Sequence, residues 1–194
     1  MSSRRRGGNP WEPDGPTPGS AAAQGAPGDP EAVAREVCLR LLTSGPRTRA
    51  QLADAVRRKG VPDEVADRVL GRFTEVGLID DEAFAQAWVQ SRHLGRGLAR
   101  RALATELRRR GVADETVNEA VGALDSGQEA ATARGLVDRK LPGTRSLDRD
   151  KRMRRLVGML ARKGYSPGLA YRVVKEALAD EGTDVEDLTD PDLA

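Results

Sequence analysis

Two stretches of this chain are rich in arginine, and they hold the residues with the clearest capacity for chemistry. The planar guanidinium of arginine donates paired hydrogen bonds to a carboxylate or a phosphate. The stretches cover residues 92–111 and 139–163, where cations far outnumber acids. We predict that an anionic partner binds through these side chains: Arg92, Arg96, Arg100, Arg101, Arg108, Arg109, Arg110, Arg139, Lys140, Arg152, Arg154, Arg155, Arg162 and Lys163.

The charge is spread unevenly along the chain, although the formal net charge is only +2. Residues 92–175 hold 20 basic and 9 acidic residues, a balance of +11, whereas residues 176–194 hold 8 acidic residues and no basic one. A basic body with an acidic end favours an anionic partner, with the acidic end as a competitor for the same surface. A solvated, charged helix surface is the plainer explanation of the same pattern.

The sequence holds few groups suited to catalysis, metal binding or cofactor binding. His93 is the single histidine and Cys38 the single cysteine, so no cysteine or histidine zinc cluster can form. His93 stands in an arginine-rich turn, where we expect a solvated or capping histidine, and Cys38 is expected to be a small core residue. Gly95 and Gly97 lack a preceding strand and a third glycine. We therefore predict no enzyme, no catalytic residue, no metal and no cofactor.

An acidic triplet precedes one of the expected helices. Asp80, Asp81 and Glu82 could together bind a divalent cation. They come directly before the apolar-periodic residues that begin at Ala83, where acids cap a helix and favour its positive end. The position therefore favours helix capping over metal binding.

Aromatic residues make up only 3% of the chain. Trp88, Tyr165 and Tyr171 do not alternate with the arginines as base-stacking platforms would. We therefore expect binding to a protein or to a nucleic acid backbone rather than to bases.

The elements that must position the arginines repeat three times. A pattern that begins at Leu52 returns at Leu103 and Leu156, which are offsets of 51 and 53 residues. Each copy has apolar residues four apart, a cation in the last turn and a glycine that ends the helix, and then an apolar residue that closes the cap: Val61, Val112 and Tyr165. One amphipathic helix follows each copy, and another precedes it, at 31–43, 81–91 and 128–140.

These patterns predict an all-α fold of three tandem three-helix repeats in an elongated array, which can be straight or curved. A composition of 38% hydrophobic and 32% charged residues agrees with solvated helices around modest cores. The predicted parts are a disordered arm at 1–30, repeats at 31–79, 80–126 and 127–180, and an acidic tail at 181–194. Because a helix of about 12 residues is roughly 18 Å long, a row of three units could cover several subunits of a polymer.

The sequence also favours a cytoplasmic location. No apolar run approaches the roughly 20 residues of a membrane helix. Nothing apolar follows Arg4, Arg5 and Arg6 to complete a signal peptide. We expect a monomer with no membrane partner.

The residues around the acidic triplet resemble a known family. Together they are similar to the central repeat of the RecX family of recombinase regulators: Leu78-Ile79-Asp80-Asp81-Glu82-Ala83-Phe84-Ala85, Trp88-Val89, Arg92, Gly97, Glu106-Leu107 and Arg110-Gly111-Val112. The segments 47–73 and 152–178 look like the first and third repeats of that family, so the resemblance covers about residues 31–178.

The resemblance implies a modulator that binds along the groove of RecA filaments on single-stranded DNA. Such a protein bridges protomers, restrains filament growth and lowers ATP hydrolysis and strand exchange, with effects on recombination, DNA repair and the SOS response. It implies that Asp80, Asp81, Phe84 and Trp88 build or orient the central unit. Arg92 and the other arginines are then the residues that contact the filament.

A tandem helix-turn-helix transcription regulator is the alternative hypothesis, because helix, glycine turn and helix also describe that motif. The segment 47–52 is a suitable start for such a motif. The helices that would read DNA, at 65–73 and 117–124, carry few polar residues suited to base edges. Weak, sequence-independent binding to DNA is compatible with either hypothesis.

Overall fold

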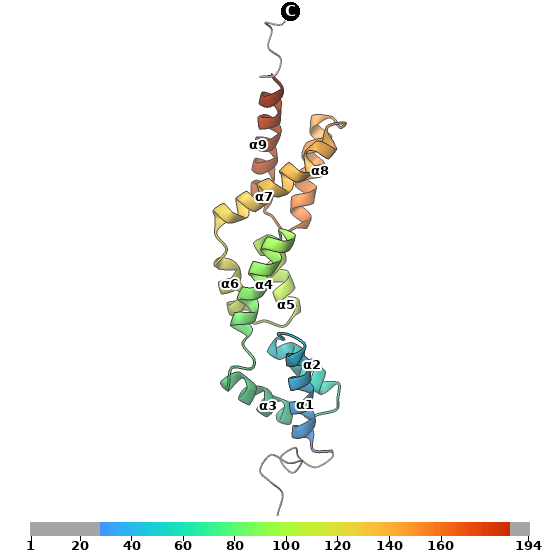
Figure 1. Ribbon diagram of the computed structural model, residues 1–194, viewed down its shortest axis with the longest axis vertical. Helices are drawn as coiled ribbons and strands as arrows, with labels where there is room; N and C mark the ends of the chain where they lie inside the picture. The colour runs from blue at the N-terminus through green and yellow to red at the C-terminus, as the bar shows by residue number, and fades with distance from the viewer. Residues whose placement is uncertain (1–27, 187–194) are drawn as a thin grey trace, which may run out of the picture.

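A computed structural model describes residues 28–186, with side chains described as far as residue 182. Within this range the chain is helical and has no strand (Figure 1). The helices are α1 (Pro30–Thr43), α2 (Arg49–Arg57), α3 (Asp63–Glu75), α4 (Asp81–Arg96), α5 (Arg100–Arg109), α6 (Asp114–Gly122), α7 (Ser126–Lys140), the short 3-10 helix η2 (Pro142–Thr144), α8 (Arg149–Arg162) and α9 (Pro167–Glu186). None of these described helices combines the length and the apolarity that crossing a bilayer requires.

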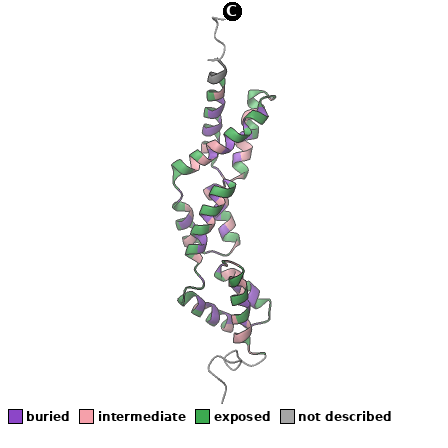
Figure 2. Cartoon of the chain, viewed as in Figure 1, coloured by how far each residue is buried: buried purple, intermediate pink, exposed green. Residues whose placement is uncertain are grey.

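Each set of three consecutive helices packs around its own core. The apolar stripe of each α-helix faces its two partners. Buried residues lie on these inner faces and exposed residues on the outside (Figure 2). The largest fully buried side chains include Leu52 and Leu70 in the first unit, Leu103 and Leu107 in the second, and Tyr165 in the third. The predicted all-α fold of three three-helix repeats is thus confirmed, and the units follow one another in an elongated row (Figure 1).

The repeated glycines end the second helix of every unit as the sequence predicted. Gly60, Gly111 and Gly164 have φ angles of 76°, 77° and 89°, in the left-handed region that favours glycine. The apolar residue after each glycine is buried, which closes the turn against the core of its unit.

The ends of some helices differ from the prediction. Helix α4 continues to Arg96 instead of ending near residue 91, and helix α9 continues to Glu186, past the predicted start of the acidic tail at residue 181. Helix α9 is held there because the Glu181 carboxylate accepts hydrogen bonds from Arg145 and Arg152. The rest of the predicted tail, residues 187–194, and residues 1–27 of the predicted arm lie outside the described residues. The boundaries proposed between repeats stay a prediction.

The first and second units meet where helix α2 begins. The first backbone N–H groups of a helix have no partner within the helix and need an acceptor from elsewhere. The backbone N–H of Arg49 donates to the carboxylate of Asp81 in the second unit, at 2.9 Å. The buried hydroxyl of Thr48 donates to the carbonyl of Arg110, at 2.6 Å. The second unit therefore supplies both a carboxylate and a carbonyl to the start of α2.

The junction between the second and third units repeats this arrangement at the start of α5. Arg100 is the first residue of α5, and its N–H donates to Glu129 in the third unit, at 3.1 Å. The N–H of Ala99 donates to the carbonyl of Lys163, at 2.9 Å. Ala99 and Lys163 stand at the same places in their repeats as Thr48 and Arg110. Because the two junctions use equivalent positions, each unit adds to the row in the same way.

A glycine at each junction allows the neighbouring units to approach closely. A Cβ atom on Gly111 would lie 2.3 Å from the Cβ of Ala50, and one on Gly164 would lie 2.5 Å from the backbone nitrogen of Ala102. The equivalent Gly60 faces no other described unit, and a Cβ there would meet nothing within 4 Å.

We expect Gly111→Ala to destabilise the protein more than the matched control Gly60→Ala. Both changes place alanine at a positive φ, which costs roughly 1–2 kcal/mol. Only Gly111→Ala also forces the Ala50 contact apart, which adds about 1–3 kcal/mol. Urea denaturation of the two variants measures the difference in the free energy of unfolding. Equal losses in both variants would show that the junction is not tightly packed.

Candidate functional site

Several of the predicted binding cations are engaged within the protein. Arg108 forms an ion pair with Asp114, at 2.6 Å. Arg100 lies 3.5 Å from Glu129 and donates to the carbonyl of Leu124. Three further cations bond internally: Arg152 to Glu181 and Thr144, Arg154 to the carbonyl of Asp150, and Lys163 to the carbonyl of Arg96. These internal bonds occupy part of the hydrogen-bonding capacity of these cations, which leaves less of it for an external partner.

A second set of predicted cations is exposed and has no hydrogen bond or ion pair within the described part of the chain. It consists of the side chains of Arg96, Arg101, Arg109, Arg139, Lys140, Arg155 and Arg162. Exposed guanidinium groups without a carboxylate partner keep their full hydrogen-bonding capacity for an external anion. These residues are the better candidates for contact, and their role stays a prediction.

Two more of the predicted arginines, Arg92 and Arg110, meet at Trp88. The central guanidinium carbon atoms of Arg92 and Arg110 lie 4.2 Å and 3.7 Å from the centre of the Trp88 ring, within cation–π range. The Trp88 indole N–H donates to Glu106, at 2.9 Å, and the Phe84 ring stacks on Trp88 with 5.7 Å between ring centres.

The spacing of aromatic residues and arginines in the sequence did not indicate this contact at Trp88. The turn that follows α5 brings Arg110 back onto α4, beside Trp88 and Arg92. Residues distant in the sequence thus form one cationic aromatic cluster.

A cleft of about 760 Å³ opens beside this cluster, between the first and second units. Leu42, Pro46 and Leu78 give it an apolar lining together with Phe84 and Trp88. Its charged lining residues are Arg47 from the first unit and Arg92 and Asp80 from the second. The cleft therefore combines apolar walls with a cationic rim.

The cationic side chains around the cleft repel one another. Burial lowers the pKa of Arg110, and the positive charges of Arg92 and Arg47 lower it further, while the Glu106 carboxylate acts in the opposite direction. The Nε atom of Arg92 is buried and has no hydrogen-bond partner among the described residues. An anion bound here would offset the repulsion between these positive charges. Arg47 lies directly before the Thr48 N-cap of α2 and was not among the binding residues predicted from the sequence.

The acidic triplet stabilises helix starts. Asp80 is the N-cap of α4 and accepts from the N–H of Ala83, at 2.8 Å, as its position before the helix indicated. The Asp81 carboxylate accepts a hydrogen bond from the backbone N–H of Arg49 at the start of α2 in the first unit. Among the described residues, no cluster of histidine, cysteine, aspartate and glutamate forms a candidate metal site.

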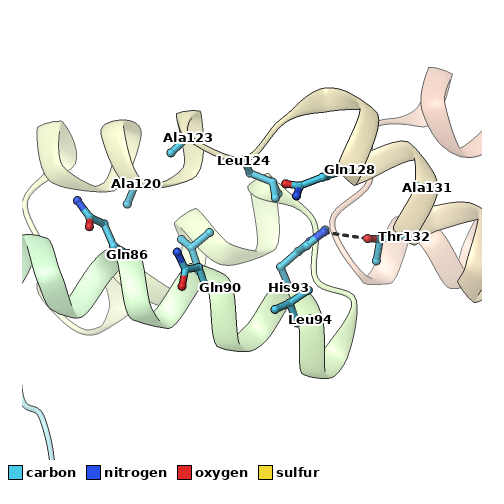
Figure 3. A pocket seen from close by; sticks show the side chains of 11 residues that line it. Gln86, Gln90, His93, Leu94, Ala120, Ala123, Leu124, Gln128, Ala131 and Thr132 are labelled. Carbon is cyan, nitrogen blue, oxygen red and sulfur yellow. Dashed lines mark hydrogen bonds between the residues drawn. The ribbon is translucent and has the colours of Figure 1, made fainter.

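His93 is buried, so the expectation of a solvated or capping histidine is wrong. Only 4% of its surface is exposed, beside a cavity of about 630 Å³ lined by α4, α6 and α7 (Figure 3). Its Nδ1 atom lies 2.9 Å from the carbonyl of Leu98, which can only accept, so Nδ1 carries the proton. Its Nε2 atom then accepts from the Thr132 hydroxyl, at 2.9 Å. His93 therefore links the second unit to the third.

Three family models match the chain in order. They describe the first, second and third three-helix domains of RecX and match residues 34–73, 80–121 and 128–174. The chain belongs to the RecX family. This membership confirms the resemblance found in the sequence.

Close relatives carry the name "Regulatory protein RecX". The protein of Streptomyces lividans is 62% identical over 180 residues, which cover 92% of this chain and 96% of the relative. The protein of Thermobifida fusca is 61% identical over 173 residues, covering 89% and 91%. That of Mycolicibacterium smegmatis is 53% identical over 156 residues, covering 78% and 82%.

Solved RecX structures share the fold. The crystal structure of RecX from Lactobacillus salivarius has a TM-score of 0.72 at 16% identity, covering 76% of this chain and 96% of that one. Another crystal structure, of regulatory protein RecX, has a TM-score of 0.68 at 22% identity, covering 76% and 72%. The arrangement of helices is thus shared with RecX proteins of low sequence identity.

Tyr165, at the second junction, should make the stability of the folded protein fall at alkaline pH. Its hydroxyl donates to the carbonyl of Gly97, at 3.1 Å, and burial, with a smaller contribution from Glu129, raises the pKa of Tyr165 to about 12. An unfolded tyrosine ionises near a pKa of about 10, so between pH 10 and 12 only the unfolded chain loses this proton. The stability that Tyr165 contributes is complete below pH 10 and is lost as the pH rises to about 12.

We expect the free energy of unfolding to fall by up to about 1.4 kcal/mol per pH unit in this interval, beyond the change seen in Tyr165→Phe. Urea denaturation of both proteins at several alkaline pH values measures the difference. Tyr171→Phe is the matched control, because Tyr171 is exposed. Identical slopes for the parent protein and Tyr165→Phe would contradict this account.

Proposed function

We propose that this protein binds RecA filaments on single-stranded DNA and inhibits filament growth, ATP hydrolysis and strand exchange. It would thereby modulate recombination, DNA repair and the SOS response, by binding and without a catalytic step of its own. Membership of the RecX family supports a regulatory role. We further propose that it acts as a cytoplasmic monomer with weak, sequence-independent affinity for DNA.

One observation carries the proposal: free arginines recur at the same place in every unit. Arg58, Arg109 and Arg162 all stand two residues before the repeated glycine. All three are exposed and have no ion pair in the described part of the chain. Since the two junctions are equivalent, these arginines recur along the row of units. A periodic row of cations suits a periodic anionic partner such as a nucleoprotein filament.

The transcription-regulator alternative is less well supported by the charge of the helices that would read DNA. The exposed residues of α3 include Asp63, Glu64 and Asp67, and those of α6 include Asp114, Glu115 and Glu119. Carboxylates on these helices would be repelled by DNA phosphates. The free arginines instead lie at the ends of the second helices.

The test is inhibition of ATP hydrolysis by RecA on single-stranded DNA. We expect the protein to inhibit at substoichiometric amounts, and Arg58→Ala/Arg109→Ala/Arg162→Ala to require about tenfold more protein, the equivalent of about 1.4 kcal/mol over three contacts. The matched control is Arg40→Ala/Arg172→Ala/Lys175→Ala, which removes three exposed, unpaired cations outside the row. Equal weakening by both variants would point to net charge alone. Lack of inhibition by the parent protein, with tight binding to one duplex sequence, would favour the transcription regulator.

A further inference from the structure

The cleft between the first two units is an apolar groove with more positive than negative charge at its edge. Arg47, Arg92 and Arg110 have no ion pair among the described residues. The nearby carboxylates are already engaged, Glu106 by the Trp88 indole and Asp80 by the start of α4. The cleft therefore offers a place for an external carboxylate.

The lining specifies the kind of ligand. The apolar walls formed by Leu42, Pro46 and Leu78 accommodate one bulky apolar side chain. The adjoining guanidinium groups suit carboxylates next to it in the sequence. A nucleobase fits less well, because the ring of Trp88 is already in contact with Arg92, Arg110 and Phe84. The favoured ligand is a peptide with a large apolar residue and neighbouring acids.

We propose that residues Trp11–Asp14 of this chain are the occupant of this cleft. The segment reads Trp-Glu-Pro-Asp, so a large aromatic side chain is followed directly by Glu12 and, two residues later, by Asp14. Trp11 is the single aromatic residue outside the described part of the chain. The indole would fill the apolar part of the cleft, and the carboxylates would pair with Arg47 and Arg92.

The length and the attachment point of the N-terminal residues allow this contact. Residues 15–28 can span up to about 45 Å when extended, at roughly 3.3 Å per residue. The cleft begins at the far end of α1, whose 14 residues have a length of about 21 Å. Helix α9 belongs to the unit at the opposite end of the row from the first unit (Figure 1), and the acidic residues 187–194 come after it in the sequence. Eight residues can reach at most about 27 Å, less than the length of α9, which is too short to reach the cleft of the same molecule.

Docking of this segment would cover Arg47, Arg92 and Arg110. An anionic partner would then have to displace the segment before it could reach these arginines. This competition rests on the proposed filament-binding function, whereas the intramolecular contact does not.

The experiment follows the indole N–H signals of the full-length, ¹⁵N-labelled protein by nuclear magnetic resonance. The chain has two tryptophans, Trp11 and Trp88, so the spectrum has two indole signals that single Trp→Phe variants assign. We expect the Trp11 signal to be displaced from that of a synthetic peptide of residues 7–18. In Glu12→Lys/Asp14→Lys the Trp11 signal should return to the peptide position, and the Trp88 signal should shift. Arg47→Glu, on the other side of the contact, should also return the Trp11 signal to the peptide position.

The matched control is Glu115→Lys/Glu119→Lys, which makes the same change in charge on exposed residues of α6. It should leave both indole signals unchanged. A Trp11 signal of the parent protein that coincides with the peptide would overturn the proposal and leave the cleft to a separate partner. A displacement that disappears on tenfold dilution would also overturn it, because the contact would then join two copies.

Discussion

The backbone N–H groups at the start of a helix need acceptors that the helix itself does not contain, and this need joins the units of the protein. Helices α2 and α5 each receive a carboxylate from the first helix of the next unit, through Asp81 and Glu129. The carbonyl before the repeated glycine provides a second acceptor at both junctions, for the Thr48 hydroxyl at the first and for the Ala99 backbone N–H at the second. Each unit thus completes the hydrogen bonding of the one before it, so their orientation is fixed by the same polar groups that stabilise them.

The orientation of the units decides what the arginines can do. Isolated surface cations contribute little to a structure, since exposed ion pairs are weak. Set at equivalent places in a row of equivalent units, Arg58, Arg109 and Arg162 become a repeated feature that a repeated partner can bind. The cluster at Trp88 depends on packing within one unit rather than on a junction, because it joins α4 to the turn after α5. The proposed function therefore depends on both the junctions and the cores.

The sequence predicted the features that depend on local rules. Helix stripes, the left-handed glycines and the N-cap role of Asp80 all depend on residues a few positions apart, and the structure agrees with them. The sequence did not indicate contacts between distant residues. His93 is hydrogen-bonded to Thr132 on another unit, and Glu181 of α9 accepts hydrogen bonds from Arg145 and from Arg152 of α8. The meeting of Arg110 with Trp88 likewise requires the three-dimensional packing of the second unit.

The most direct test of this account removes one acceptor from each junction and leaves every arginine in place. Asp81→Ala/Glu129→Ala takes one carboxylate from each junction. The measurement is the amount of this variant that is needed to halve ATP hydrolysis by RecA on single-stranded DNA, with helical content checked by circular dichroism. Loss of the fixed row should raise that amount about tenfold, the equivalent of about 1.4 kcal/mol. Inhibition by this variant at the same amount as the parent protein would contradict the account.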